Sequence, residues 1–411
     1  MGNEIHVMLN ALKQSLELQE QQFKDSLILN PVENIPASNI LKPASGFLHG
    51  LYNSDTIRTD AEKFNSKIQF GGRDVIANDI SQIYSVWAKL LGAEKLSMRM
   101  LSGLHAHIVI FMGLCSIGSK VMILPEKAGG HMSSWAILER LGIDLREVPY
   151  DNVEQRVHRE KCLELIDSFS PDIIFIDRSE GLIYEDFSWL GQCCSCYKIF
   201  DASQYLTNIL AKDYRNPFDM GFNLMLSTMH KNLPGPQRAL VCSREHDVYW
   251  DRLKKSMSTY VSNMHVFSIY SAGLLLEQID KLTLLSQDML SNAIQLDLAL
   301  QKAGIPVVMR SCDQSSPPTH HCWIHPPSQQ KAFSYYLDLT RAGILTNYRL
   351  LPYNIGYGLR LGLSAATYAG LSAEHIDLLA AQMAEIYRHG YSELAHNRVK
   401  ALVCEIKGSA K

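Results

Sequence analysis

The sequence lacks the features that mark membrane, disulfide-rich and nucleic-acid-binding proteins. No apolar run approaches the roughly 20 residues of a membrane-spanning helix, and the N-terminus has no apolar signal-peptide core. The formal net charge is -3 without a long basic run, which argues against nucleic acid as a partner. The nine cysteines, an odd number, form no recognisable disulfide framework. These absences predict a cytoplasmic protein with reduced thiols.

Length and composition place the chain among ordinary globular proteins. Its 411 residues are 46% hydrophobic and 20% charged, the usual balance of folded domains. This length exceeds what one small core supports, so about two or three structural units are expected. We predict an N-terminal helical arm over residues 1–30, a large domain over 31–285 and a small C-terminal domain over 286–411.

The predicted arm is an amphipathic helix over residues 3–29. Gln and Glu occupy much of it, and its apolar stripe consists of Ile5, Met8, Leu9, Leu12, Leu16 and Leu18. Such a stripe packs on another surface, and a second subunit is one candidate.

Apolar runs alternate with helical patterns through the large domain. Strands are predicted at 121–124, 172–177, 197–201, 222–228 and 239–242, and helices at 75–91, 103–115, 132–142 and 186–196. This order predicts an α/β fold with a mostly parallel sheet that carries helices on both faces. In the smaller unit, a helical stretch at 271–303 precedes strands near 305–310, 321–325 and 357–363 and a closing helix at 373–388.

Four candidate groups stand where predicted strands end, which is where an open parallel sheet binds ligands. Lys231 lies in a Pro- and Gly-rich turn, and Asp201 ends a strand. Gly129-Gly130-His131 follows another strand, and Ser102-Gly103 opens a helix whose free N–H groups suit a phosphate.

Together these groups fit the requirements of pyridoxal 5'-phosphate. A lysine can form a Schiff base with an aldehyde, a carboxylate can keep the pyridine nitrogen protonated, and an imidazole can stack on the ring. Each feature alone has a commoner explanation: a solvated lysine, a helix cap, a turn aspartate or a histidine with internal partners. Their joint order along the chain favours the cofactor.

The same motifs resemble those of the serine hydroxymethyltransferases and their non-folate relatives, which are pyridoxal-phosphate enzymes of fold type I. The matching segments, between residues 29 and 390, are Leu29-Asn30-Pro31-Val32-Glu33-Asn34 for L-I-A-S-E-N, Ala61-Glu62 and Phe70-Gly71-Gly72 for Y-A-E-G-Y-P…Y-Y-G-G, Leu101-Ser102-Gly103 for H-S-G-S, Gly129-Gly130-His131 for G-G-H, Asp201-Ala202-Ser203-Gln204 for D-M-A-H, His230-Lys231 for T-H-K-T-L-x-G-P, and Gly358-Leu359-Arg360-Leu361-Gly362 for S-G-I-R-I-G. Pro234-Gly235-Pro236-Gln237 is similar to the threonine transaldolase branch.

The resemblance implies a role for each matching residue. Lys231 would carry the cofactor and, with Glu62 and His131, would be catalytic. The implied cofactor-binding residues are Ser102, Gly103, His131, Ser179, Asp201, Gln204, Thr228, His230 and Lys231. Arg360 would grip the substrate carboxylate, with Glu62 and Phe70 beside the substrate.

Several departures from the family pattern concern the subunit interface, where the family's active sites lie. Phe70 and Asp60 stand at tyrosine positions, and Val32 replaces a serine. The glycine-rich P-G-G-Q-G-G is absent, and Tyr260 and Ser262 offer hydroxyls in its place. A homodimer is still implied, with an open question as to which residues the second subunit supplies.

Other departures concern folate. Arg349 stands where the family carries a folate-contacting asparagine, and Glu126 replaces an apolar residue near the same pocket. A pterin ring placed against an unpaired buried charge would lose about 1–3 kcal/mol. We therefore predict that folate is not used.

The predicted function is aldol- or transaldol-type chemistry at the α-carbon of glycine or a β-hydroxy amino acid, with an aldehyde partner, in a specialised biosynthetic pathway. A folate-dependent hydroxymethyltransferase is the first alternative; β-elimination, decarboxylation or racemisation on the same scaffold is another. A catalytically inactive homologue is disfavoured by Asp201, Lys231 and Arg360.

No metal site is predicted. Cys193-Cys194-Ser195-Cys196 lacks a second pair at zinc spacing. The histidines at 320, 321 and 325 lie on a strand-like run and are interpreted as structural.

Overall fold

A seven-stranded sheet forms the centre of the fold. The computed structural model describes residues 2–53, 57–66, 68–193, 195–313 and 316–408. The strand order is β2-β10-β9-β8-β7-β3-β4, and the strands are β2 (Lys95–Ser97), β10 (Ala239–Ser243), β9 (Leu224–Thr228), β8 (Tyr197–Asp201), β7 (Ile173–Asp177), β3 (Lys120–Ile123) and β4 (Asp144–Glu147). β10 runs antiparallel to both of its neighbours, and the other pairs run parallel.

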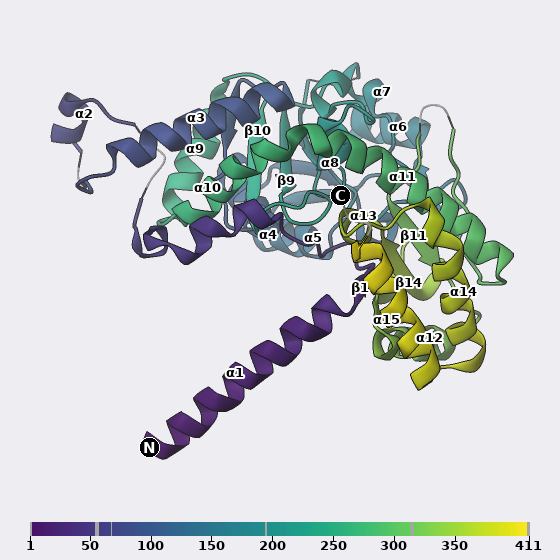
Figure 1. Ribbon diagram of the computed structural model, residues 1–411. Helices are drawn as coiled ribbons and strands as arrows, with labels where there is room; N and C mark the ends of the chain where they lie inside the picture. Colours follow the sequence, from purple (N-terminus) through teal and green to yellow (C-terminus); the bar gives the residue numbers. More distant parts are fainter. Residues whose placement is uncertain (1, 54–56, 67, 194, 314–315, 409–411) are drawn as a thin grey trace.

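Helices cover both faces of this sheet (Figure 1). Successive side chains of β8 join different clusters, Ile199 on one face and Phe200 on the other, because strand side chains alternate. One face carries α4 (Gly103–Leu114), α5 (Met132–Arg140) and α9 (Val248–Tyr260); the other carries α3 (Asp74–Leu91), α6 (Arg159–Phe169), α7 (Ser188–Gly191), α8 (Leu206–Leu210) and α10 (Val266–Leu274). The predicted α/β fold with a mostly parallel, doubly covered sheet is confirmed.

A second unit contains the antiparallel sheet β11-β14-β13. Its elements are β11 (His321–Ile324), β13 (Asn347–Leu351), β14 (Gly356–Gly362), α11 (Ile279–Lys302), α12 (Gln329–Ala342), α13 (Ser364–Tyr368), α14 (Ala373–His389) and α15 (Glu393–Gly408). The predicted boundary after residue 285 falls inside α11, where Leu282 joins the central-sheet cluster and Met289 the second unit's cluster. The division into domains stays a prediction.

Helix α1 (Gly2–Lys24) extends away from the rest of the chain in Figure 1. The six residues of its predicted apolar stripe are all exposed. The prediction that this helix reaches residue 29 is wrong, because Leu27 and Ile28 form β1, which pairs with β12 (Ile344–Leu345). That pairing connects the N-terminal segment to the second unit.

Two other predicted elements differ from the structure. The helix expected over 186–196 is only α7. Its last residue, Gly191, packs so closely on Met220 that an added Cβ would lie 2.4 Å from the Met220 carbonyl oxygen. Residues 305–310 form only a bridge, Val307 with Ile324, since Pro306 has no N–H to extend a ladder. Short elements complete the chain: α2 (Asp60–Phe64), β5 (Tyr150–Asp151) and β6 (Arg156–Val157). Within the described residues, each helix is too short or too polar to cross a membrane.

Candidate active site

Two carboxylates lie side by side at the carboxyl edge of the central sheet. β7 ends at Asp177 and β8 ends at Asp201, and these residues are register partners. Both side chains are buried. β9 ends at Thr228, and Lys231 follows in the next turn. The expected meeting of Asp201 and Lys231 at this edge is present, and Asp177 joins them. The strand-end rule that singled out Asp201 also applies to Asp177, so the sequence carried that signal.

The turn that carries Lys231 is fixed by backbone hydrogen bonds. Met229 N donates to Arg238 O at 2.9 Å, and Gly235 N donates to Met229 O at 2.8 Å. Asn34 Nδ2 donates to Lys231 O at 2.7 Å, which connects the L-I-A-S-E-N-like segment to the lysine. A Cβ on Gly235 would lie 2.4 Å from Met229 O, so the turn needs glycine there. The lysine side chain thus leaves a rigid base.

The first turn of α4 lies against the end of β9. Ser102 caps the helix by accepting a hydrogen bond from His105 N at 3.2 Å. A Cβ on Gly103 would lie 2.7 Å from Thr228 Cγ2, so glycine permits this close approach. The free N–H groups of the turn therefore lie near the turn that carries Lys231, where an anion such as a phosphate can accept them.

His131 stands at the N-terminus of α5. Its Nδ1 accepts a hydrogen bond from Ser133 N at 3.2 Å, and its own backbone N donates to Asp177 Oδ2 at 3.3 Å. Burial lowers the pKa of His131, which favours the neutral imidazole. Ser179 Oγ donates to Asp177 Oδ1 at 2.7 Å, so Asp177 connects two of the predicted cofactor residues.

Asp201 has a partner that the sequence analysis missed. His107 Nε2 lies 2.8 Å from Asp201 Oδ2, and Ser134 Oγ lies 3.1 Å from His107 Nδ1. Burial would raise the pKa of Asp201, but the hydrogen bond and charge of His107 and the charge of Lys231 lower it. The missed signal is spacing: His107 follows Gly103 by one helical turn, which places both on one face of α4.

Arg360 belongs to a chain of charged groups. Arg360 Nη1 lies 3.4 Å from Glu180 Oε1, and Arg349 also pairs with Glu180 and lies 3.6 Å from Glu126. The expected penalty for a pterin ring applies only if Glu126 and Arg349 lack partners, and here they pair with each other and with Glu180. That folate is not used stays a prediction. Burial lowers the pKa of Arg360 to about 10 and raises that of Glu180. Glu180 adjoins Ser179 in sequence, but nothing in the sequence indicated a bridge between two arginines.

Several buried polar atoms are available to a ligand. Within the described residues, Thr228 Oγ1, Gln204 Nε2, His230 Nδ1 and Arg360 Nε have no hydrogen-bond partner. A buried polar atom without a partner costs about 1–3 kcal/mol, which a bound group with oxygen and nitrogen atoms can recover. Gln204 Oε1 lies 3.4 Å from His321 Nε2, so its amide is held from one side. This donor set fits a phosphorylated pyridine and a carboxylate.

Glu62 and Phe70 are not brought to this edge within one chain. Glu62 is exposed on α2, at the projecting end of the molecule in Figure 1. Its Oε2 accepts from Thr59 N at 2.8 Å in a capping box, which lowers the pKa of Glu62. Phe70 packs on Tyr52 with ring centroids 4.8 Å apart and lines a separate cavity with Arg58 and Arg73.

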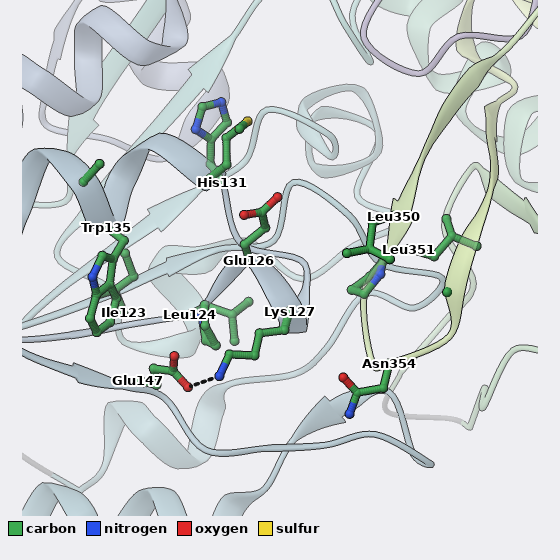
Figure 2. Close-up of a pocket in the computed structure, with 15 residues that line it drawn as sticks. Ile123, Leu124, Glu126, Lys127, His131, Trp135, Glu147, Leu350, Leu351 and Asn354 are labelled. Atoms are coloured by element: carbon green, nitrogen blue, oxygen red, sulfur yellow. Dashed lines mark ion pairs between the residues drawn. The ribbon is translucent and has the colours of Figure 1, made fainter. Parts of the chain in front are cut away.

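A cavity of about 610 Å³ opens beside His131. Figure 2 shows Trp135 on one side, Leu350 and Leu351 on the other, and Glu126 between them. Lys127 and Glu147 form an ion pair of 3.3 Å at its edge. The cavity is mostly apolar, and it is large enough for a second small molecule next to the lysine edge.

Of the cysteines and histidines interpreted as structural, His321 contacts the predicted cofactor residue Gln204. Cys193 is exposed and Cys196 is buried, and Cys194 lies outside the described residues. His320 and His321 are buried in and beside β11. The groups with metal-ligand spacing that the described residues do contain are His107, His131 and Asp177, within 4.8 Å of one another. They belong to the hydrogen-bond network described above.

Comparisons with known proteins point to the same family as the motifs. No protein-family model matches the chain. A serine hydroxymethyltransferase of Sulfolobus acidocaldarius is 24% identical over 87% of this chain and 84% of its own length. An L-threonine:uridine-5'-aldehyde transaldolase of a Streptomyces species is 25% identical over 84% of this chain and 82% of its own length.

A solved structure shares the fold. The L-threonine transaldolase of Pseudomonas fluorescens, in its internal aldimine state, superposes with a TM-score of 0.90 over 99% of this chain and 94% of that chain, at 20% identity. The resemblance, the fold class and the pyridoxal-phosphate class predicted from the sequence are confirmed by these matches. The chain is thus similar in sequence to serine hydroxymethyltransferases and to a transaldolase, and it has the fold of the solved L-threonine transaldolase.

Proposed function

We propose that the chain binds pyridoxal 5'-phosphate at the carboxyl edge of its central sheet and acts at the α-carbon of glycine or a β-hydroxy amino acid. One observation carries the proposal: Asp201, Lys231 and the N-terminus of α4 converge there beside buried donors that lack partners among the described residues. The cofactor, when bound, supplies an electron-withdrawing ring that accepts the electron pair of a bond broken at the α-carbon.

Each residue has a defined task in this proposal. Lys231 holds the cofactor and moves a proton at the substrate's α-carbon, and Asp201 keeps the pyridine nitrogen protonated. Ser102 and Gly103 place the helix N-terminus at the phosphate, and His131 stacks on the ring. The remaining contacts to the cofactor come from Ser179, Gln204, Thr228 and His230.

Arg360 selects the amino acid by its carboxylate. A guanidinium presents two parallel donors to a carboxylate, and Arg360 Nε has no partner among the described residues. Glu180 and Ser179 O hold the guanidinium from the other side, at 3.4 and 3.3 Å from Nη1. Its orientation is therefore set before the substrate arrives.

The second substrate is an aldehyde, bound in the cavity beside His131, and the reaction makes or breaks the Cα–Cβ bond without folate. The transaldolases among the similar proteins support an aldehyde. Glu126 lines this cavity and pairs with Arg349, which also pairs with the buried Glu180, so a pterin ring would meet an ion pair where the family has an apolar residue and an asparagine.

The active unit in this proposal is a cytoplasmic homodimer. The exposed apolar face of α1 offers an interface. Helix α2, which carries Glu62, lies far from β9 in Figure 1, so Glu62 and the nearby Phe70 would complete the site of the second copy. Glu62 would then move the proton of the substrate's β-hydroxyl there. The free thiols of the described cysteines suit a reducing compartment.

A folate-dependent hydroxymethyltransferase is the second candidate, because several similar proteins bear that name and the cavity of about 610 Å³ adjoins His131. The test is incubation with glycine or threonine, with and without tetrahydrofolate, while α-proton exchange and aldehyde release are followed. Equal rates in both support the proposal. Strong acceleration by folate with serine as product would establish the second candidate instead.

A further inference from the structure

His107 lies at the centre of a buried polar network that no strand-end rule explains. Its Nε2 lies 2.8 Å from Asp201 Oδ2, and its Nδ1 lies 3.1 Å from Ser134 Oγ. Asp201 Oδ1 accepts a separate hydrogen bond from Ser203 N at 2.8 Å. Both oxygens of Asp201 are therefore engaged, and the plane of its carboxylate is fixed by two different elements, α4 and the turn after β8.

The carboxylates around His107 favour a positive charge on its ring. Asp177 and Asp201 are buried register partners, and a ligand atom of His107 lies within 4.8 Å of one from Asp177. Two carboxylates this close repel each other strongly in a buried setting. Lys231 disfavours a proton on the imidazole. The ring of His131 lies 5.6 Å from that of His107, and burial lowers the pKa of His131, so His131 adds no positive charge there. Burial likewise disfavours the charged ring, but the hydrogen bond and charge of Asp201, with the charge of Asp177, raise the pKa of His107.

We propose that His107 is a positioning residue that carries a permanent proton and acts as the shared counter-ion of Asp201 and Asp177. In this state Nε2–H donates to Asp201, and Nδ1–H donates to Ser134 Oγ. Both imidazole donors are then used, and Asp201 remains ionised with a fixed orientation.

A Ser–His–Asp arrangement of this kind is also the geometry of a hydrolase triad. Ser134 is fully buried within α5, so no substrate can reach its hydroxyl. A nucleophile also needs an unprotonated histidine to take its proton. The network therefore orients the Asp201 carboxylate and does not activate the Ser134 hydroxyl.

The value of this network for the reaction rests on the proposed function of Asp201. An ionised, immobile carboxylate keeps the pyridine nitrogen protonated, whereas a protonated Asp201 would compete with the ring for the same proton. Burial would raise the pKa of Asp201, and the hydrogen bond and charge of His107 oppose that effect and keep the carboxyl ionised.

The charge of His107 is directly measurable in the full-length protein. Nitrogen-15 NMR of the histidine side chains, recorded with and without pyridoxal 5'-phosphate, should show both His107 nitrogens protonated from pH 6 to pH 8. The signal is assigned by its absence in H107N. A neutral tautomer at pH 7 would overturn the proposal. Because the cofactor-free sample gives the answer, a charged His107 in a protein that fails to bind cofactor would refute only the proposed function.

Two variants at one position separate charge from hydrogen bonding. H107N keeps a neutral donor for Asp201 and H107K keeps the cation. H107N should weaken cofactor binding by about tenfold or more, the scale of a hydrogen bond to a charged group, and H107K should weaken it less. Equal losses would contradict the counter-ion role. If neither variant folds, S134A provides the second test, because removal of the Nδ1 acceptor should lower the NMR titration midpoint of His107; an unchanged midpoint would contradict the network.

Discussion

The carboxyl edge of the central sheet and the α2 segment (residues 57–66 and 68–74) hold predicted site residues in opposite ways. At the sheet edge, Asp201 is 5% exposed and bonded to His107. In the α2 segment, Glu62 is exposed, and its bonds go to the adjacent Thr59. The edge is organised by contacts between residues far apart in sequence, such as His107 with Asp201. The segment is organised by contacts with its own sequence neighbourhood, such as Lys63 with Asp74 and Phe70 with Tyr52. The sheet edge can form a site within one chain, whereas the α2 segment needs another surface to form one.

Mixing two inactive variants tests whether Glu62 acts in the site of the other subunit, and it should give the largest effect. Lys231→Ala and Glu62→Gln should each lose about 10²–10⁴-fold in activity, the range for a group that moves a proton in the transition state. If Glu62 serves the second subunit, mixed dimers contain one intact site, and random mixing should restore about a quarter of wild-type activity.

The control is a mixture of wild type with Lys231→Ala, in which activity should follow the wild-type dose. No recovery in the mixture of the two variants would place Glu62 in its own chain's site or outside both sites. Unchanged activity of Glu62→Gln alone would remove Glu62 from the chemistry.

Arg360→Lys probes the substrate end of the sheet edge. The lysine retains the charge and loses the paired donors, so amino-acid affinity should fall by about 1.5–3 kcal/mol, and cofactor binding should be unchanged. Arg349→Lys is the matched control, because Arg349 pairs with the same Glu180 and also with Glu126. Titration of the visible spectrum with glycine measures the affinity of each variant. Equal losses in the two variants would show that Arg360 is not the residue that binds the substrate carboxylate.

The buried His320, which precedes β11, should make the stability of the protein depend on pH. Burial lowers the pKa of His320 to about 3, below its ordinary 6.5. The unfolded chain therefore binds a proton that the folded chain refuses, so stability is present above pH 6.5 and is lost as pH falls towards 3. His320 should remove about 2 kcal/mol of unfolding free energy between pH 7 and pH 5. Urea unfolding at several pH values measures this, and His320→Asn should show a shallower dependence; identical slopes would exclude His320 as the cause.

Thr59→Ala should have the smallest effect. Loss of this cap costs about 0.5–2 kcal/mol of local helix stability, and α2 contributes no residue to the buried hydrophobic clusters. Hydrogen exchange should quicken across α2 while the global unfolding midpoint stays constant. A lowered midpoint would show that α2 is integrated into the main fold.

The residues that the sequence could place are those on buried strands. Apolar runs fixed the ends of β7, β8 and β9, so Asp201 and Lys231 were predicted to meet. The sequence could not predict the partners of these residues. His107 reaches Asp201 across 94 positions, and Arg349 reaches Glu180 through the fold of the second unit. Such pairings depend on tertiary packing that periodicity does not encode.

Boundaries failed where long-range pairing competed with local propensity. The first predicted helix was extended through Leu27 and Ile28, which instead pair with Ile344 and Leu345. Glu62 matched its motif, and Phe70 stood at a tyrosine position of the next one. A motif in an exposed segment does not specify which chain's site it joins.

The identity of the cofactor-bearing lysine is the central claim, and chemical mapping tests it directly. Purified enzyme that contains pyridoxal 5'-phosphate is reduced with borohydride and digested, and the modified peptide is sequenced. The account predicts a pyridoxyl group on Lys231 and on no other lysine, with loss of the visible absorption band in Lys231→Ala. A pyridoxyl group on a different lysine would contradict the assignment of the site to the carboxyl edge of the central sheet.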